Sequence, residues 1–323
     1  MIPATVDVIH YPDDPAPAVR WSQPVVALGN FDGVHRGHAK ILEEVYRRAA
    51  ARRTTPAVLT FDPHPSRVVR PDRAAPLIMT MAQKLEAFAA AGMAGTAIVR
   101  FTKALSQWDP DRFVRTVLVE WLQVGEVCVG ANFLFGRNRS GNFTLLRELG
   151  AQYGFEAEKV EPVRYKDFVV SSTRLRRLIA DGRVDEAGAL LGHHYTLDGR
   201  VEQGDGRGRG HGVPTANLQT DNELLPADGV YATTAVIDRV LHPSVTNVGV
   251  RPTFGEGGPR TIETHLLDGG GDGAPVDLYG LPLRLAFVQR LRDERTFANA
   301  AALRRQIDDD CARARGLFQQ ISL

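Results

Sequence analysis

Short apolar runs alternate with stretches of helical periodicity over the first half of the chain. The apolar runs over 24–28, 56–61, 96–101 and 126–130 have the length and content of buried strands, and a further strand is predicted near 156–163. Helical patterns between them predict helices over 39–50, 81–91, 110–121 and 144–153, with Thr80 as an N-cap, Gly92 as a stop and Pro110 at a first helical position. Apolar strands that alternate with helices predict an α/β doubly wound parallel sheet, Rossmann-like and covered on both faces.

The pattern changes after about Leu191. Short alternating runs over 195–202, 230–238, 261–267 and 283–288, separated by glycine and proline turns, predict an antiparallel β-barrel. A helix over 173–180 precedes this region, and a C-terminal helix over about 300–317 follows it. Residues 185–192 form the end of the first domain or a bridge. We therefore expect two domains, residues 1–186 and residues 187–323.

Composition supports this division and narrows the class of protein. A length of 323 residues fits about two domains, and 43% hydrophobic with 24% charged residues is typical of a globular protein. The balance of 39 basic and 38 acidic residues gives no reason to expect a nucleic-acid or membrane partner. Cys128 and Cys311 form no metal or disulfide pattern. Because no long apolar span or signal sequence is present, we expect a cytoplasmic protein.

Ten residues, 29–38, read GNFDGVHRGH between the first strand and the first helix. Such a turn gathers backbone N–H groups and a helix N-terminus, which suits an anionic phosphate. His35 and His38 add donors three residues apart. A plain tight turn and a zinc site remain alternatives, although no cysteine or third histidine lies nearby at ligand spacing. A Walker A loop is excluded because no Gly-Lys-Ser/Thr follows.

Further polar residues follow the other strands of the predicted sheet. Asp62 and His64 come after the second strand and Asn132 after the fourth, at the edge where parallel sheets bind ligands. Ser172 or Ser171 is a natural N-cap, and Ser172, Thr173 and Arg176 would lie on the first turn of the helix as a phosphate clamp. The alternatives are polar turns and a simple cap with solvated arginines.

The second domain carries its own phosphate-binding pattern. Residues 204–212 hold five glycines at alternate positions, either a phosphate loop or a flexible linker, and PTAN follows at 214–217. Thr215 and Asn217 alternate on a strand, so both can reach one cation. Glu263 lies on an alternating strand, where a carboxylate can take a proton from an attacking alcohol. The alternative for Glu263 is an exposed strand residue.

These motifs resemble one family in their order. Residues 29–38 are similar to the HxGH motif of the nucleotidyltransferase superfamily, and in their full form to bacterial bifunctional riboflavin kinase/FAD synthetases. Residues 129–136 and 170–176 resemble that family's Gx(D/N)FxFG and SSTxxR segments, and 214–217 resembles the PTAN motif of riboflavin kinases. The resemblance spans roughly residues 22–310.

The resemblance implies two linked reactions, with Mg²⁺ and ATP at both sites. The C-terminal barrel would phosphorylate riboflavin to FMN with release of ADP, and the N-terminal domain would adenylylate FMN to FAD with release of pyrophosphate. The implied roles are catalysis by Glu263, His35 and His38; ATP and phosphate binding by Gly29, Asn30, Phe31, Asp32, Gly33, Ser172, Thr173, Arg176, Gly210 and Pro214; flavin binding by Asp62, His64, Asn132 and Arg292; and Mg²⁺ binding by Thr215 and Asn217. A monomer or weak homo-oligomer is expected.

Two other functions stay open at this point. The chain can be a riboflavin kinase with a silent first domain, or a flavin- or nucleotide-binding regulator without turnover. The presence of His35 and His38 argues against a silent first domain. The presence of Glu263, Thr215 and Asn217 argues against a regulator without turnover.

Overall fold

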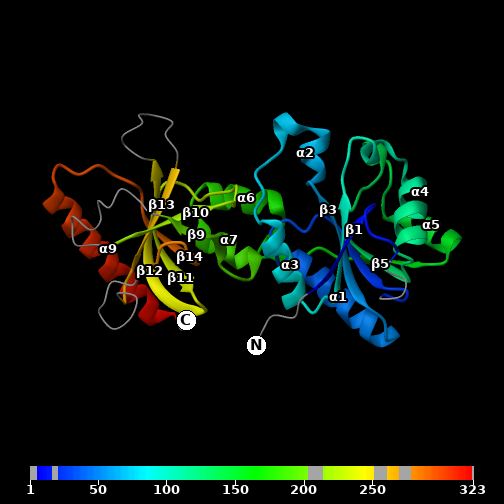
Figure 1. Cartoon of the computed structure of the whole chain (residues 1–323), viewed down its shortest axis with the longest axis horizontal. Coiled ribbons are helices and arrows are strands. Elements are labelled where there is room, and N and C mark those ends of the chain that lie inside the picture. Colours follow the sequence, from blue (N-terminus) through cyan, green and yellow to red (C-terminus); the bar gives the residue numbers. More distant parts are fainter. Residues whose placement is uncertain (1–5, 17–20, 203–213, 251–259, 269–277, 322–323) are drawn as a thin grey trace. The chain divides into compact units, whose positions relative to one another are not determined.

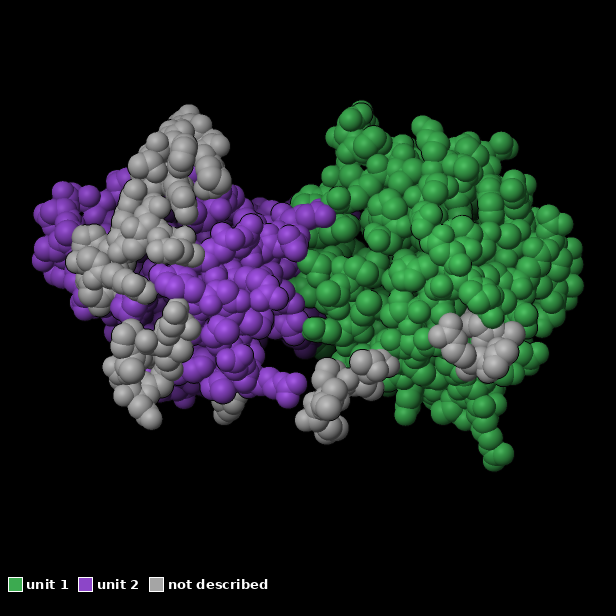
Figure 2. All heavy atoms as spheres, viewed as in Figure 1, with its two compact units in different colours: residues 1–172 green, residues 173–323 purple. Residues whose placement is uncertain are grey.

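The computed structural model describes residues 6–16, 21–202, 214–250, 260–268 and 278–321 (Figure 1). The chain divides into two compact units, residues 1–172 and residues 173–323 (Figure 2). The boundary predicted at 186/187 falls inside helix α7 (Val184–Leu191) and stays a prediction.

A six-stranded parallel sheet forms the centre of the first unit, as the apolar runs predict. Its strand order is β1-β4-β3-β2-β5-β6, and every neighbouring pair is parallel. The strands are β1 (Asp7–Tyr11), β2 (Val25–Leu28), β3 (Pro56–Asp62), β4 (Gly95–Arg100), β5 (Glu126–Gly130) and β6 (Glu156–Val160). Only β1 lacks a counterpart in the predicted elements, because its five residues mix polar and apolar side chains at the edge of the sheet.

Helices cover both faces of this sheet, which confirms the doubly wound fold. Val25 and Ala27 of β2 belong to a core that includes Leu42 of α1 (Arg36–Arg52) and Phe88 of α3 (Met81–Ala90). The alternate residues of β2 face a second core built with α4 (Pro110–Phe113), η3 (Val114–Trp121) and α5 (Phe143–Tyr153). The helix predicted over 110–121 is thus present, with its second part π-helical.

The strand order reverses between β2 and β5. Going along the chain, β3 and β4 are added on one side of β2, whereas β5 and β6 are added on the other. In such sheets the crevice at the carboxyl ends of the strands flanking the reversal is the usual ligand site. Residues 29–38 follow β2 and Asn132 follows β5, so both lie at this point.

The second unit is a closed six-stranded barrel, as predicted, with strand order β10-β13-β12-β11-β14-β9. All of its pairs are antiparallel. The strands are β9 (Tyr195–Glu202), β10 (Ala216–Thr220), β11 (Gly229–Ile237), β12 (Val240–Val250), β13 (Arg260–Leu266) and β14 (Pro282–Arg292). Helix α9 (Ala300–Gln320) packs on the outside, where its Ala314 joins a core with Ala232 and Val245.

Strand β12 was not predicted because its inward positions carry hydroxyls instead of apolar side chains. Thr246 is fully buried and lies 2.7 Å from Thr233 of β11 and 2.8 Å from Thr264 of β13, oxygen to oxygen. Thr233 also bonds Ser244 at 2.8 Å. These hydroxyls satisfy one another in the barrel interior, so the strand needs no apolar alternation on that face.

The remaining described elements are short. They are α2 (Pro65–Val69), the hairpin β7 (Arg164–Tyr165) and β8 (Phe168–Val169), α6 (Ser172–Ala180), and the 3₁₀ turns η1 (Pro71–Arg73), η2 (Leu105–Gln107) and η4 (Arg137–Arg139). Cys128 and Cys311 are buried and unpaired with each other, as their spacing suggests.

Candidate active sites

The two histidines of residues 29–38 form a stacked pair at the start of α1. His35 is the N-cap of this helix, and its Nδ1 accepts a hydrogen bond from the backbone N–H of His38 at 3.2 Å. The two rings are 3.7 Å apart between centroids and 11° from parallel. The helix begins three residues earlier than the periodicity predicts, and this places both imidazoles at its positive end.

Burial keeps both imidazoles neutral near pH 7. His35 is 6% exposed, and burial lowers its pKa to about 4. Burial also lowers the pKa of His38 well below its usual value, with further contributions from His35 and the Lys84 ammonium. The Nδ1 atom of His38 is buried without a hydrogen-bond partner among the described residues. The pair therefore offers neutral N–H donors to a developing negative charge, not fixed cations.

The loop before the histidines is held in left-handed conformations. Phe31 has φ +50°, and its buried ring contacts the rings of His38 and Phe88 edge-on, at 5.2 and 5.7 Å between centroids. Gly33 has φ +91°, and a Cβ there would lie 3.1 Å from the side chain of Ile78. Gly29 donates its N–H to the Leu59 carbonyl at 3.1 Å. The loop conformation therefore depends on neighbours from β3 and the segment before α3.

Asp32 holds the loop to that segment. Its buried carboxylate accepts the backbone N–H groups of Ile78, at 3.0 and 3.2 Å, and of Met79 at 3.3 Å. A carboxylate engaged in this way positions the loop, so the expected ATP contact of Asp32 would be made by its backbone. Asn30 is exposed at the surface of the same loop.

The start of α6 joins this loop. The Ser172 hydroxyl donates to the Asp32 carbonyl at 2.8 Å. Ser172 is the first residue of α6, so Ser171 and not Ser172 precedes the helix. Thr173 and Arg176 follow in the second unit, on the first two turns of the helix. The structure thus brings Ser172 to residues 29–38.

The candidate flavin contacts in the first unit lie on both sides of β2. Asp62 ends β3 and is exposed, and Asn132 is exposed in the turn after β5. His64 caps α2: its Nδ1 accepts from the Ser66 N–H at 3.2 Å and lies 2.8 Å from the Ser66 hydroxyl. Because β3 and β5 both neighbour β2, all three residues share the carboxyl edge of the sheet with the histidines.

In the barrel, three polar residues lie in one row across adjacent strands. Asn217 of β10 is directly opposite Glu263 of β13, and Glu263 is in turn opposite Asn247 of β12. Directly paired residues have Cβ atoms about 5 Å apart and on the same side of the sheet. The side is the outer one, because Val245, two residues from Asn247, packs toward α9. All three residues of the row are partly exposed.

Thr215 and Pro214 lie immediately before this row. Thr215 is two residues before Asn217, and the Pro214 carbonyl accepts a hydrogen bond from His265 Nδ1 at 2.9 Å. A hydroxyl, an amide oxygen and the Glu263 carboxylate are the hard oxygen donors that suit Mg²⁺. No group of three or more His, Cys, Asp or Glu arranged for a metal occurs in the described part of the chain. Gly210, with the glycines over 204–212, lies outside the described residues.

Arg292, a predicted flavin contact, is bound within the barrel. Its guanidinium pairs with the Asp310 carboxylate of α9, with Nε at 3.0 Å and Nη2 at 2.9 Å from Oδ2. Asp310 is 2% exposed. The ion pair ties β14 to α9, and the flavin contact stays a prediction.

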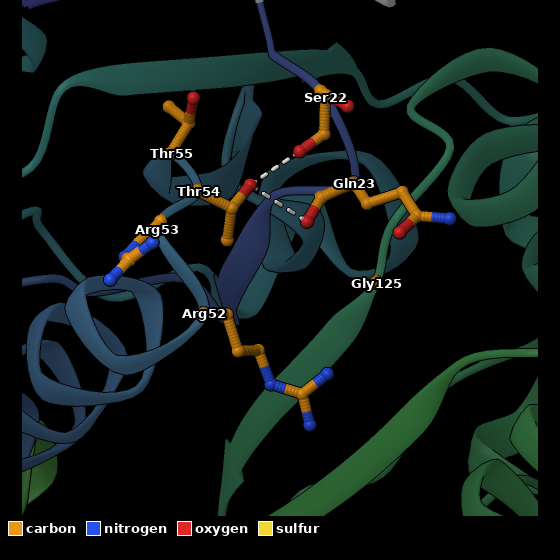
Figure 3. A pocket seen from close by; sticks show the side chains of 7 residues that line it. All are labelled: Ser22, Gln23, Arg52, Arg53, Thr54, Thr55 and Gly125. Carbon is orange, nitrogen blue, oxygen red and sulfur yellow. Dashed lines mark hydrogen bonds between the residues drawn. The ribbon is translucent and has the colours of Figure 1, made fainter.

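The opposite edge of the parallel sheet carries a polar pocket of about 390 Å³ (Figure 3). Its lining residues stand at the amino ends of β2, β3 and β5, away from residues 29–38; they are Ser22, Gln23, Arg52, Arg53, Thr54, Thr55 and Gly125. The Thr54 hydroxyl donates to the backbone carbonyls of Ser22 and Gln23. The pocket is therefore separate from the candidate site.

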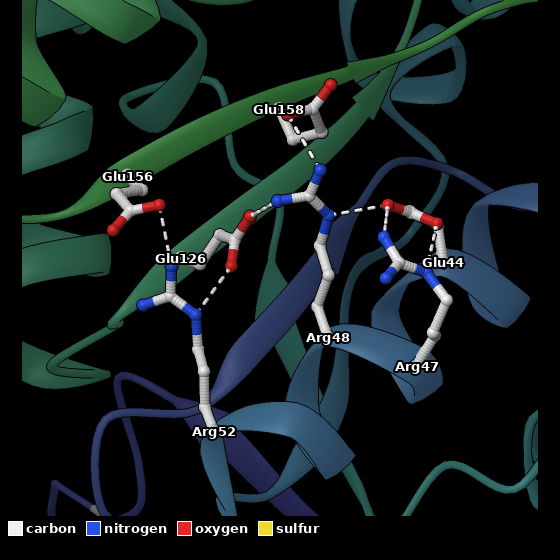
Figure 4. A network of polar contacts seen from close by, with 7 residues as sticks. All are labelled: Glu44, Arg47, Arg48, Arg52, Glu126, Glu156 and Glu158. Carbon is white, nitrogen blue, oxygen red and sulfur yellow. Dashed lines mark hydrogen bonds and ion pairs between the residues drawn. The ribbon is translucent and has the colours of Figure 1, made fainter.

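An ion-pair network beside this pocket joins α1 to β5 and β6 (Figure 4). Glu126 is 1% exposed and lies 2.5 Å from Arg48 and 3.0 Å from Arg52. The two arginines reach on to Glu158 at 2.8 Å and Glu156 at 2.6 Å. These charges pair with one another, so we assign them to the stability of the fold.

Sequence reasoning missed two residues at the sites, Lys84 and Asn247. Lys84 was covered by the helix predicted over 81–91, but no local pattern shows that its side chain is buried beside residues 29–38. Asn247 lies in a strand that the pattern did not predict.

A parallel sheet with neutral imidazoles at its reversal point, followed by a barrel with a carboxylate–amide row, defines a two-site enzyme that acts on phosphates. Residues 18–174 match the FAD synthetase family and residues 191–318 match the riboflavin kinase family. The chain belongs to the family of bifunctional riboflavin kinase/FMN adenylyltransferases.

Relatives named for both activities support this membership. The bifunctional riboflavin kinase/FMN adenylyltransferase of Pseudomonas fluorescens is 37% identical over 91% of this chain and 92% of its own length. The enzyme of Escherichia coli K12 is 34% identical over the same shares.

A solved structure shares the fold. A Streptococcus pneumoniae protein described as a macrolide-efflux protein has a TM-score of 0.84 and 28% identity, over 96% of this chain and 99% of that one. Among the described residues, no helix is long and apolar enough to cross a bilayer.

Proposed function

We propose that the barrel transfers the γ-phosphoryl group of ATP to riboflavin, and that the parallel-sheet unit transfers AMP from a second ATP to the resulting FMN. The observation that carries this is the separation of the two family matches. Each match, over 18–174 and over 191–318, contains its own set of candidate phosphate-binding side chains. The products are FMN with ADP at one site and FAD with pyrophosphate at the other.

At the first site the FMN phosphate attacks the α-phosphorus of ATP, and the bond to the pyrophosphate oxygen breaks. The nucleophile is already an anion, so no base is required. His35 and His38 donate neutral N–H groups to the α-phosphoryl oxygens as charge develops there. Gly29, Gly33 and the backbone of Asn30, Phe31 and Asp32 shape the phosphate loop, and Ser172, Thr173 and Arg176 bind the phosphates that leave.

The flavin end of FMN would lie along the same sheet edge. Asp62, His64 and Asn132 supply polar contacts there, next to the partly buried ring of Phe61, which meets Phe101 edge-on at 5.7 Å between centroids. A partly buried aromatic ring beside a few polar groups suits a flat ring system with polar substituents.

At the second site the ribityl 5′-hydroxyl attacks the γ-phosphorus. Glu263 takes the proton of that hydroxyl, and ADP leaves. Thr215 and Asn217 would hold Mg²⁺, which neutralises phosphate charge when bound. Pro214 and Gly210 would border the phosphates. Arg292 would contact the flavin only through the part of its guanidinium left accessible beside Asp310.

Product analysis tests both assignments in one preparation. The protein is incubated with riboflavin, ATP and Mg²⁺, and the flavins are separated; FAD is the expected product. FMN alone would support a kinase with a silent first domain, and no product would support a non-catalytic binder.

Two variants separate the sites. His38→Ala should lose FAD formation and keep FMN formation, because only the first site uses that imidazole. Glu263→Ala should lose FMN formation and still adenylylate supplied FMN. Loss of both reactions in a folded His38→Ala protein, or kinase activity retained in Glu263→Ala, would show that the assignments are wrong.

A further inference from the structure

Lys84 is a buried lysine beside the candidate adenylyl-transfer site. Its side chain is 2% exposed on α3. Lysine is among the residues least often fully buried, because removing an ammonium from water costs several kcal/mol or more. Its Nζ donates a hydrogen bond to the backbone carbonyl of Asn30 at 3.2 Å. The buried ammonium thus contacts one peptide of the loop formed by residues 29–38.

The same carbonyl has a second buried donor. The Thr60 hydroxyl of β3 donates to the Asn30 oxygen at 3.3 Å, and Thr60 is fully buried. Two donors from different elements therefore fix the orientation of the Asn30–Phe31 peptide.

The orientation of this peptide decides where the next N–H points. The Asn30–Phe31 bond is trans, so the Phe31 N–H points opposite to the Asn30 carbonyl and away from Lys84 and Thr60. This N–H donates no hydrogen bond within the described residues. Phe31 also holds a left-handed φ of +50°, a conformation that costs a non-glycine residue about 1 kcal/mol or more unless its surroundings enforce it.

Helix α3 enforces this conformation at two points one turn apart. Lys84 holds the carbonyl before Phe31, and Phe88, four residues later on the same face, packs against the Phe31 ring. We propose that Lys84 is a positioning residue for adenylyl transfer, which holds the Asn30–Phe31 peptide so that the Phe31 N–H faces the phosphates of ATP. The proposal rests on the assignment of residues 29–38 as the adenylyl-transfer site.

Lys84 has a second effect on the same site. Besides burial, the stacked His35 and the Lys84 ammonium of α3 lower the pKa of His38. Removing the ammonium should therefore raise the pKa of His38. A role confined to folding would not move this value.

The test compares Lys84→Met with Lys84→Arg in the full chain. Lys84→Met removes the charge and the donor at similar length; kcat for FMN adenylylation should fall about 100-fold, as a misplaced binding group predicts. The acid limb of its pH profile should move to higher pH. Lys84→Arg keeps a charged donor, so its kcat should be at least about tenfold higher than that of Lys84→Met.

Controls are available within the same molecule. Riboflavin kinase activity should stay within about twofold, because Lys84 lies in the other unit. Lys159→Met is a matched control, since Lys159 is a half-exposed lysine of the same unit paired with Glu161 at 3.1 Å; it should leave adenylylation unchanged. An equal loss in Lys159→Met would overturn the proposal.

Folding is read separately, through tryptophan fluorescence, because Trp21, Trp108 and Trp121 are the three tryptophans of the chain and all lie in the first unit. A folded Lys84→Met protein that adenylylates FMN within about threefold of the parent, with an unmoved acid limb, would overturn the proposal. If Lys84→Met does not fold, Lys84→Gln decides by the same criteria. Full activity in His38→Ala would instead refute the site on which the proposal rests.

Discussion

Acidification should destabilise the first unit through His35, by an amount that follows from the burial of its imidazole. Burial lowers the pKa of His35 from 6.5 to about 4. At 1.36 kcal/mol per pKa unit, the folded unit favours the neutral ring by about 3 kcal/mol. The unfolded chain takes up this proton first as the pH falls. The contribution of the neutral His35 ring to the stability of the first unit is therefore complete above about pH 6.5, and it is lost as the pH falls toward about 4.

The variant His35→Asn isolates this effect. The side-chain oxygen of asparagine can replace Nδ1 as the acceptor for the His38 N–H, and asparagine is a favoured N-cap, so the cap of α1 is kept. The ring and its titration are lost. The variant loses the stacking contact at every pH. The effect of the titration is therefore read from how the stability difference between the parent and His35→Asn changes with pH.

The measurement is thermal unfolding followed by tryptophan fluorescence, which reports the first unit alone. Between pH 7.5 and pH 5, the parent should lose roughly 2 kcal/mol more stability than His35→Asn. For a unit of this size that corresponds to roughly 4–8 °C in Tm. Parallel Tm curves for the two proteins over this range would refute the burial of a neutral His35 as the origin of the effect.

Two further predictions concern the barrel. Asn247→Ala should lower riboflavin kinase kcat about tenfold and leave adenylylation unchanged, because Asn247 faces Glu263 across the β12–β13 pair; a kcat within twofold of the parent would refute a role for the row. Arg292→Met leaves the buried Asp310 carboxylate without its counter-charge and should cost the barrel about 3–5 kcal/mol, seen as faster heat inactivation of the kinase; inactivation no faster than that of the parent would refute this role of the ion pair. A stable Arg292→Lys protein with a raised KM for riboflavin would show that Arg292 contacts the flavin.

Local patterns predicted most of the fold because most elements carry their own signals. Thr80 and Gln83 form a reciprocal capping box at the start of α3, and the strand predicted over 126–130 coincides with β5. These signals lie within a few residues of one another, so a single sequence contains them. Strand β12 was not predicted from the local pattern, because its inward side chains carry hydroxyls that bond to other strands.

The candidate sites were predicted as motifs, but not as contacts. The carboxylate of Asp32 binds backbone 46 residues further along the chain, and Lys84 bonds a carbonyl 54 residues before it. Arg292 meets Asp310 only because α9 folds back on the barrel. Such pairings depend on tertiary packing, which residue spacing does not encode. The motifs therefore identify the loop, whereas the structure shows which groups, such as the Asp32 carboxylate and Lys84, hold it in place.

The side chains proposed for the two sites match the proton requirements of the two proposed reactions. The FMN phosphate attacks as an anion, so the first site needs donors for developing charge and no base. Buried imidazoles whose pKa values are lowered remain neutral donors and do not compete for protons near pH 7. The ribityl hydroxyl of riboflavin carries a proton that must leave, so the second site needs an acceptor, and Glu263 stands on the outer side of the barrel between two amides that cannot take its place. Exchanging these groups would serve neither reaction, because a carboxylate would repel the phosphates at the first site and a neutral donor would leave the hydroxyl protonated at the second.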